Sequence, residues 1–237
     1  MKNIKILVLT IILTSTGLFA IGGFGLQVGQ SSFSVAESSP ESGITGVTLT
    51  NGSFDGAYVL GGYLYIDAIP FIDLEVDANI TGNTYDINFS NNSGLDGAVV
   101  EMDPIPFGWI STNVYYTLRK KVFSVSIPFL AGAKLHAGGG FNTHKSSPVA
   151  DIDMIKNILG GTDDALLNGD VSGLDADLLK DLEDNLVDAS GFHFQTGLQF
   201  KLLMLDTFLN FRYTIVDDVV PDAGGFGSVN FRLGFGI

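Results

Sequence analysis

Three histidines carry the clearest potential for chemistry in this chain of 237 residues. Imidazole ligates borderline metals such as Zn²⁺ and acts as a general base. His136 and His193 fall in segments predicted to be neighbouring antiparallel strands, which would place them at the same height, with His144 at the start of the loop between them. We therefore expect a candidate metal site or general base here. The simpler alternative is that the histidines hydrogen-bond within a polar rim.

The amino-acid composition and the absence of known motifs exclude several kinds of catalytic and binding site. The chain has no cysteine, which excludes disulfides, thiol catalysis and thiolate metal sites. It lacks a Gly-rich phosphate-binding loop, a nucleophile elbow and a metalloprotease motif. The 26 acidic residues against 12 basic ones give a formal net charge of −14, which disfavours nucleic acid as a partner. We expect no resident cofactor; a divalent cation bound at the outer mouth or in the loops is the one alternative.

The elements that would position these residues are strands, because apolar and polar residues alternate with a period of two. The clearest case is the C-terminal segment, where Val229, Phe231 and Leu233 alternate with Asn230 and Arg232. Eight such segments are predicted, covering residues 22–30, 56–67, 70–80, 108–119, 122–137, 192–201, 209–215 and 228–237.

Two local features complicate this scheme. Asn51-Gly52 is a strong hairpin signal, so residues 44–50 are an alternative first strand. Pro128 would lie inside the strand predicted at 122–137, where it cannot donate a ladder hydrogen bond.

The predicted connections alternate between short and long. Short links fall near residues 69–70, 120–121 and 203–204, and long ones span 31–54, 81–107, 138–190 and, less extended, 217–225. Outer-membrane barrels have this pattern of tight periplasmic turns and extended outer loops. The loop at 138–190 holds eleven acidic residues against three basic ones. Helical spacing of apolar residues predicts two short helices in it, at 151–159 and 174–187.

Alternation of apolar and polar residues is compatible with both a soluble barrel and a membrane barrel. The apolar face of each strand points inward in a soluble barrel and outward, toward lipid, in a membrane barrel. Aromatic residues near strand ends favour the membrane barrel. Its lumen would then hold Asp67 and the residues of a predicted charge network. These are Asp73, Glu75, Asp77, Asp206, Arg119, Lys134, Lys201, Arg212 and Arg232. An eight-stranded barrel has little interior space, so these charges must pair. We expect a plugged lumen; the alternative is a charge-selective pore.

The first twenty residues have the layout of a secretory signal peptide. Lys2 and Lys5 form the basic head, residues 6–13 the apolar core, and residues 14–20 a segment of mostly small residues. We expect cleavage after Ala20, which leaves residues 21–237 as one barrel domain.

That domain resembles the small outer-membrane barrels of the OmpA, OmpX and OmpW type. Residues 127–133 resemble their Pro-aromatic-aliphatic-Gly-Ala strand motif, and residues 230–235 resemble the signal bound by the barrel-insertion machinery, although the chain ends on Ile237 instead of an aromatic residue. The resemblance implies an all-β, antiparallel transmembrane barrel of about eight strands in the outer membrane, with short helices in one long outer loop. It implies outer-membrane lipid and the insertion machinery as partners, and we expect a monomer.

Three functions remain open at this point. The first is a structural or surface-interacting barrel without catalytic activity, which is the function we predict. The second is a narrow channel for small solutes or apolar molecules. The third is an enzyme that modifies lipids of the outer leaflet, with an inward histidine as its base and Ser146 or Ser190 as its partner.

Overall fold

The computed structural model describes residues 22–39, 46–67, 72–91, 100–101, 103–127, 130–158, 160–162, 177, 180–181 and 184–236. The predicted signal peptide lies outside these residues and stays a prediction. In the described part of the chain, no helix is long and apolar enough to span a membrane.

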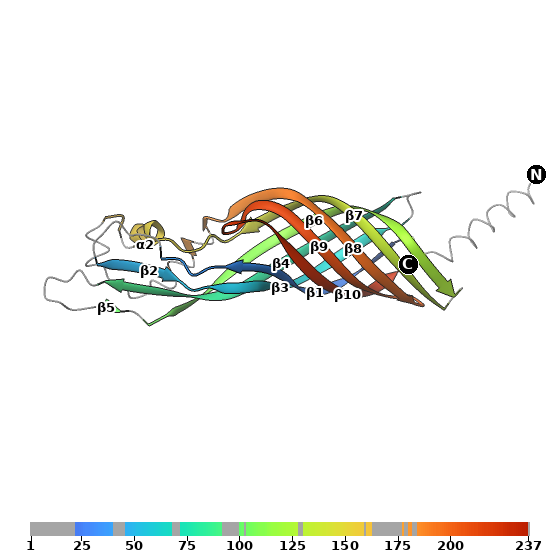
Figure 1. Cartoon of the computed structure of the whole chain (residues 1–237), viewed down its shortest axis with the longest axis horizontal. Helices are drawn as coiled ribbons and strands as arrows, with labels where there is room; N and C mark the ends of the chain where they lie inside the picture. The colour runs from blue at the N-terminus through green and yellow to red at the C-terminus, as the bar shows by residue number, and fades with distance from the viewer. Residues whose placement is uncertain are drawn as a thin grey trace, which may run out of the picture.

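Eight antiparallel strands close into a ring, which forms the tilted barrel of Figure 1. They are β1 (Gly22–Val35), β3 (Phe54–Ile66), β4 (Asp73–Asn91), β6 (Ile105–Ile127), β7 (Ala131–Ser146), β8 (Val187–Leu202), β9 (Leu205–Val220) and β10 (Ala223–Gly236). The ring follows chain order and closes between β1 and β10, where Gly23 lies opposite Gly236 and Ser32 opposite Gly227. The all-β antiparallel barrel of eight strands is therefore confirmed.

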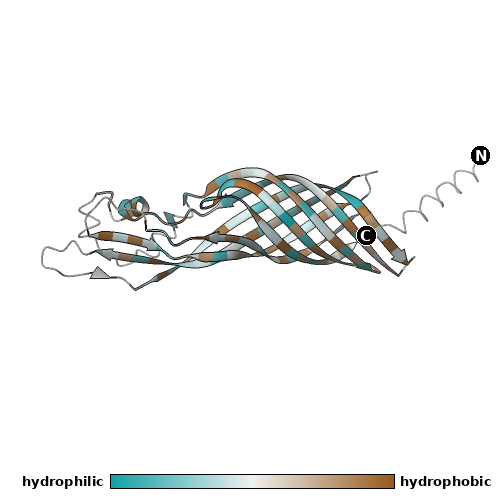
Figure 2. Ribbon diagram, in the orientation of Figure 1, coloured by the Kyte–Doolittle hydropathy of each residue, from teal (hydrophilic) through white to brown (hydrophobic). Residues whose placement is uncertain are grey.

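The apolar side chains of the barrel point outward. On β10, Val229 and Phe231 are 44% and 51% exposed, whereas Asn230 and Arg232 between them are buried. Hydrophobic and hydrophilic residues alternate in the same way along the other barrel strands in Figure 2. We call the exposed apolar band the apolar belt; it includes Leu26, Val28, Leu60, Leu64, Ile80, Tyr116, Leu118, Phe141, Phe192, Phe194, Leu209, Phe211, Tyr213, Val229, Phe231 and Leu233. An apolar outer face with a polar interior is the construction of a transmembrane barrel, and it excludes the soluble alternative.

The turn predicted at Lys120-Lys121 is wrong. Strand β6 runs through both lysines to Ile127, with a β-bulge between Lys121 and Phe123 in its pairing with β7. The bulge restores the outward direction of the apolar residues after two consecutive lysines, because one extra residue exchanges the two faces of a strand. Strand β6 ends at Ile127, and Pro128 falls outside the described residues.

The predicted hairpin at Asn51-Gly52 is also wrong. Strand β2 (Val47–Asn51) does not pair with β3; both pair antiparallel with the same edge of β4. Asn51 lies opposite Ile87 and Tyr58 opposite Gly82, so β2 and β3 are one strand interrupted by a short irregular segment. Gly56, near the start of β3, has a φ of 63°, a conformation that favours glycine. Residues 44–50 are therefore not the first barrel strand, which is β1.

The strands rise further above the apolar belt than the sequence predicts. We call this part the outer extension: β2, β5 (Val100–Glu101), residues 83–91 of β4, residues 105–110 of β6 and helix α2 (Ile152–Ile158). Its labelled elements β2, β5 and α2 lie together at the left end of Figure 1. The predicted loop at 138–190 is correspondingly shorter, since β7 continues to Ser146 and β8 begins at Val187.

The first helix predicted in that loop is confirmed as α2. The Asp151 carboxylate caps its first turn by accepting a hydrogen bond of 2.8 Å from the backbone N–H of Met154. Most of the second predicted helix lies outside the described residues, although Asp177, Lys180, Asp181 and Asp184 within it are helical.

Candidate functional site

Two buried carboxylates form the centre of the lumen. Glu75 and Asp77 are neighbours on the inward face of β4, and Arg232 of β10 bridges them, with 2.9 Å from Nη1 to Glu75 Oε1 and 3.0 Å from Nη2 to Asp77 Oδ2. Arg119 of β6 adds a 2.7 Å ion pair to Glu75, and Arg212 of β9 pairs with Asp77. All five side chains are at most 4% exposed. Each carboxylate therefore faces two guanidinium groups, which offsets the cost of burying it.

The rest of the predicted charge network lies toward the inner end of the barrel, the end away from the outer extension. Arg119 also reaches Asp67 at 2.8 Å and Asp73 at 3.8 Å, and Lys134 lies 3.4 Å from Asp67. Asp206 accepts hydrogen bonds from Tyr65 and, at 3.1 Å, from Gln199. Lys201 lies opposite Asp206 in the ladder between β8 and β9. The structure thus brings most of the predicted set into direct contact.

Amides and aromatic rings fill the space between the charges. Gln195 donates to Glu75 at 2.7 Å and accepts from Arg212 Nε at 3.0 Å. The Arg119 guanidinium lies 4.5 Å from the Tyr65 ring centre, and that of Arg212 lies 3.8 Å from the Tyr115 ring centre. A cavity among Glu75, Arg119 and their neighbours measures about 10 Å³, which is room for roughly one water molecule. These contacts describe a packed interior.

Glycines on the inward face of the wall make room for the large side chains. Gly234 on β10 faces Tyr63, and a Cβ added at Gly234 would overlap the backbone oxygen of Phe24 and lie 2.5 Å from the Tyr63 hydroxyl oxygen. At Gly227 on the same strand, the nearest atom to an added Cβ is Cβ of Ser32, at 4.0 Å.

Gly234→Ala is therefore expected to lower the free energy of unfolding by about 1–3 kcal/mol, the usual cost of overpacking. The measurement is a urea titration of the protein in lipid vesicles, with Gly227→Ala as the control on the same strand. Equal effects of the two substitutions would contradict the expected overpacking at Gly234.

The three histidines do not share a site. His136 lies opposite Gly197 and His193 opposite Gly140 in the ladder between β7 and β8, so the prediction that they lie at the same height is wrong. His144 is not in a loop but on β7, opposite Ala189. His193 and His144 both pack edge-on against the Tyr115 ring, with ring centres 5.0 Å and 5.6 Å from it, whereas His136 lies toward the inner end of the barrel. Within the described residues, no group of three or more His, Cys, Asp or Glu side chains is placed to hold a metal ion.

The three histidines have different polar partners inside the wall. His136 Nε2 lies 3.6 Å from Asp73 Oδ2 near the inner end, and His193 Nε2 lies 2.8 Å from Thr117 Oγ1. His144 Nδ1 lies 3.5 Å from Ser111 Oγ, which accepts a hydrogen bond from Ser146. All three histidines, like Ser146, are buried, whereas Ser190 is exposed on the outward face of β8. The described geometry thus offers no histidine and serine pair at the lipid-facing surface.

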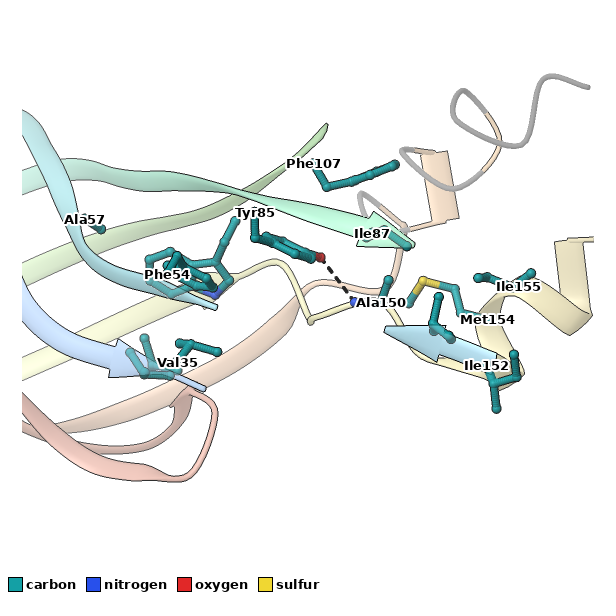
Figure 3. Packing of buried hydrophobic residues seen from close by; sticks show 14 of the residues in the cluster. Val35, Phe54, Ala57, Tyr85, Ile87, Phe107, Ala150, Ile152, Met154 and Ile155 are labelled. Carbon is teal, nitrogen blue, oxygen red and sulfur yellow. Dashed lines mark hydrogen bonds between the residues drawn. The ribbon is translucent and has the colours of Figure 1, made fainter. Parts of the chain in front are cut away.

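Above the charge network the inward face of the strands becomes apolar. On β4, Glu75, Asp77 and Thr81 are followed on the same face by Tyr85, Ile87 and Phe89, all buried. Figure 3 shows Ile152, Met154 and Ile155 of α2, which belong to the same apolar cluster as Ile87. The cluster also includes Val35, Val47, Leu49, Phe54, Ala57, Phe107, Trp109, Ala150, Val216, Val219, Val220 and Phe226. This apolar core fills the outer mouth of the barrel.

Trp109 and Tyr85 make the central contacts of this core, Trp109 by ring packing and Tyr85 by a hydrogen bond. The Trp109 ring is 1% exposed, with its centre 5.4 Å from the ring of Phe33 and 6.1 Å from that of Phe54. The Tyr85 hydroxyl accepts a 3.3 Å hydrogen bond from the backbone N–H of Ala150, the dashed line in Figure 3. Burial raises the pKa of Tyr85, so its hydroxyl stays protonated at neutral pH. The segment that enters α2 is thereby held onto the barrel mouth.

This core was not expected from the sequence, because residues 81–107 were predicted to be a loop. The signal was present: Tyr85, Ile87 and Phe89 alternate with Thr84, Asp86 and Asn88, with the same period of two as the barrel strands.

Comparison with known proteins returned no matching family model and no matching curated protein. Among solved structures, the chain is similar to the N-terminal β-barrel domain of OprF from Pseudomonas aeruginosa, with 7% identity, a TM-score of 0.42 and coverage of 92% of this chain and 99% of that one. It is similar to the outer membrane protein OprG from Pseudomonas aeruginosa, with 11% identity, a TM-score of 0.43 and coverage of 93% and 96%. It is also similar to Neisserial surface protein A, with 8% identity, a TM-score of 0.42 and coverage of 91% and 96%.

Proposed function

We propose that this protein is a non-conducting, non-enzymatic barrel of the outer membrane whose outer extension is an interaction surface above the lipid. The observation that carries the proposal is the filling of the barrel along its length. Tyr63, Tyr65 and Phe208 pack together at the inner end, the ion pairs around Glu75 and Asp77 fill the middle, and the apolar core fills the mouth. A solute would have to displace all three layers.

The construction of the outer extension supports the proposal that it is an interaction surface. Strand β4 rises above the apolar belt with an apolar inward face covered by α2 and a polar outward face. Thr84, Asp86 and Asn88 are exposed on that outward face, and Thr50 of β2 lies opposite Asn88. A sheet that is packed on one side and hydrated on the other is rigid enough to present a fixed surface to a partner.

Single-channel recording in planar bilayers tests the absence of conductance. The purified barrel is expected to give no current steps above the leak, because the ion pairs and the mouth core fill the described part of the lumen. A large porin, whose wider barrel encloses a water-filled channel, is the positive control for insertion and recording. Stable current steps from this protein would contradict the proposal and favour the narrow channel.

A further inference from the structure

A groove runs across the outward face of the barrel wall from β1 to β8. Its volume is about 650 Å³, and its lipid-side walls include Leu26, Leu60, Ile80 and Val114. Ala78 forms part of its floor, where the small side chain leaves the surface hollow. Because this face meets lipid, an apolar groove of this size fits an acyl chain.

The upper end of the groove is polar. Thr112, Thr143, Lys145 and Asp188 line it, and all four are exposed on the outward face of their strands. Lys145 and Asp188 lie opposite each other in the ladder between β7 and β8. Within the described part of the chain, neither Lys145 nor Asp188 forms an ion pair within 4 Å. Both charges are therefore available to a ligand.

The position of this pair matches the height of lipid headgroups. On β7, the outward side chains change from apolar Phe141 to Thr143 and then Lys145, and on β8 from Phe192 to Ser190 and then Asp188. Phe141 and Phe192 form a ring pair with centres 5.0 Å apart, the kind of aromatic contact that marks the boundary of the hydrocarbon layer. Lys145 and Asp188 therefore lie just above the hydrocarbon, at the level of phosphates and amines.

We propose that the groove binds a phospholipid with a zwitterionic phosphoethanolamine headgroup. One acyl chain lies along Leu60, Ala78 and Val114, Lys145 contacts the phosphate, and Asp188 contacts the ammonium group. The charge pattern selects this headgroup: a purely anionic lipid would satisfy Lys145 but place negative charge beside Asp188, which is unfavourable. A zwitterion satisfies both residues at once.

Native mass spectrometry of the folded barrel tests the proposal, with phosphatidylethanolamine and phosphatidylglycerol of identical acyl chains as competing probes. We expect a one-to-one adduct that favours phosphatidylethanolamine. Lys145→Gln and Asp188→Asn should each weaken it by about 2- to 5-fold, the effect of one partly exposed charge contact. Asp188→Asn should also reduce the preference over phosphatidylglycerol, since it removes the repulsion. Ala78→Phe, which fills the groove, should weaken the binding of both lipids.

Lys120→Gln and Asp217→Asn are the matched controls, because both residues are exposed and lie outside the groove. They should leave lipid binding unchanged. All variants alter exposed side chains, and each is checked for the folded state by its mobility in unheated detergent gels. Equal binding of the two lipids by the native protein would overturn the headgroup assignment. The assignment of the groove as the binding site would be overturned by either of two results. One is an equal loss of lipid binding in the groove variants and the controls, and the other is unchanged lipid binding in Ala78→Phe.

Discussion

Replacing Arg232 by alanine is expected to lower the free energy of unfolding by about 3–5 kcal/mol, the cost of leaving buried charges without their partner. Arg232 is 1% exposed and contacts both Glu75 and Asp77, and its Nε donates to Gln27 at 2.8 Å. Without it, two adjacent carboxylates share only Arg119 and Arg212. Urea titration in lipid vesicles measures the change, and the fluorescence of the single tryptophan, Trp109, reports unfolding.

Two further variants show whether the loss comes from the ion pairs. Lys120→Ala removes an exposed base outside the network and is expected to change stability by no more than about 0.5 kcal/mol. The double variant Arg232→Ala with Asp77→Asn should be less destabilised than the sum of the two single variants, because the second change removes a charge that the first leaves unpaired. Strict additivity, or a loss below about 1 kcal/mol for Arg232→Ala, would contradict the network.

Replacing Trp109 by alanine is expected to remove about 3–5 kcal/mol of packing free energy from the core of the outer mouth. Trp109 is buried against Phe33 and Phe54, and this core is what holds α2 on the barrel. The expected result is faster proteolytic cleavage at residues 147–158, which lead into and form α2, with the gel mobility of the folded barrel retained. Limited proteolysis followed by mass spectrometry of the fragments measures it.

Ile110→Ala is the matched control, since Ile110 is the next residue on β6 but is 50% exposed on the outward face. It should leave the cleavage rate unchanged. If cleavage at residues 147–158 is no faster in Trp109→Ala than in the native protein, the apolar core does not hold this segment in place.

The sequence predicted the barrel and the residues of its lumen well, because both follow from a period of two. Glu75, Asp77 and Arg232 could be placed inside as soon as their apolar neighbours were placed in lipid. The contacts between them could not be predicted, since β4 and β10 are not neighbours and only the closed ring brings Arg232 to Glu75.

Register explains the largest error at the candidate site. Placing His136 and His193 at one height assumed that both lie at the same end of their strands. The ladder between β7 and β8 instead pairs His136 with Gly197 and His193 with Gly140. Strand length was the second unknown: β7 continues past His144 to Ser146, so the apparent loop residue belongs to the wall. Alternation sets the face of a side chain but neither its register nor the end of its strand.

The central claim is that one face of each strand meets lipid and the other fills the lumen, and cysteine scanning along β10 tests it most directly. The chain has no native cysteine, so single substitutions report unambiguously. Thiol labels at Val229→Cys and Phe231→Cys should be quenched by lipid-soluble quenchers, whereas Ser228→Cys and Asn230→Cys should resist labelling in the folded protein because both side chains are buried. Labels at residues 229 and 231 that respond only to water-soluble quenchers would contradict the account.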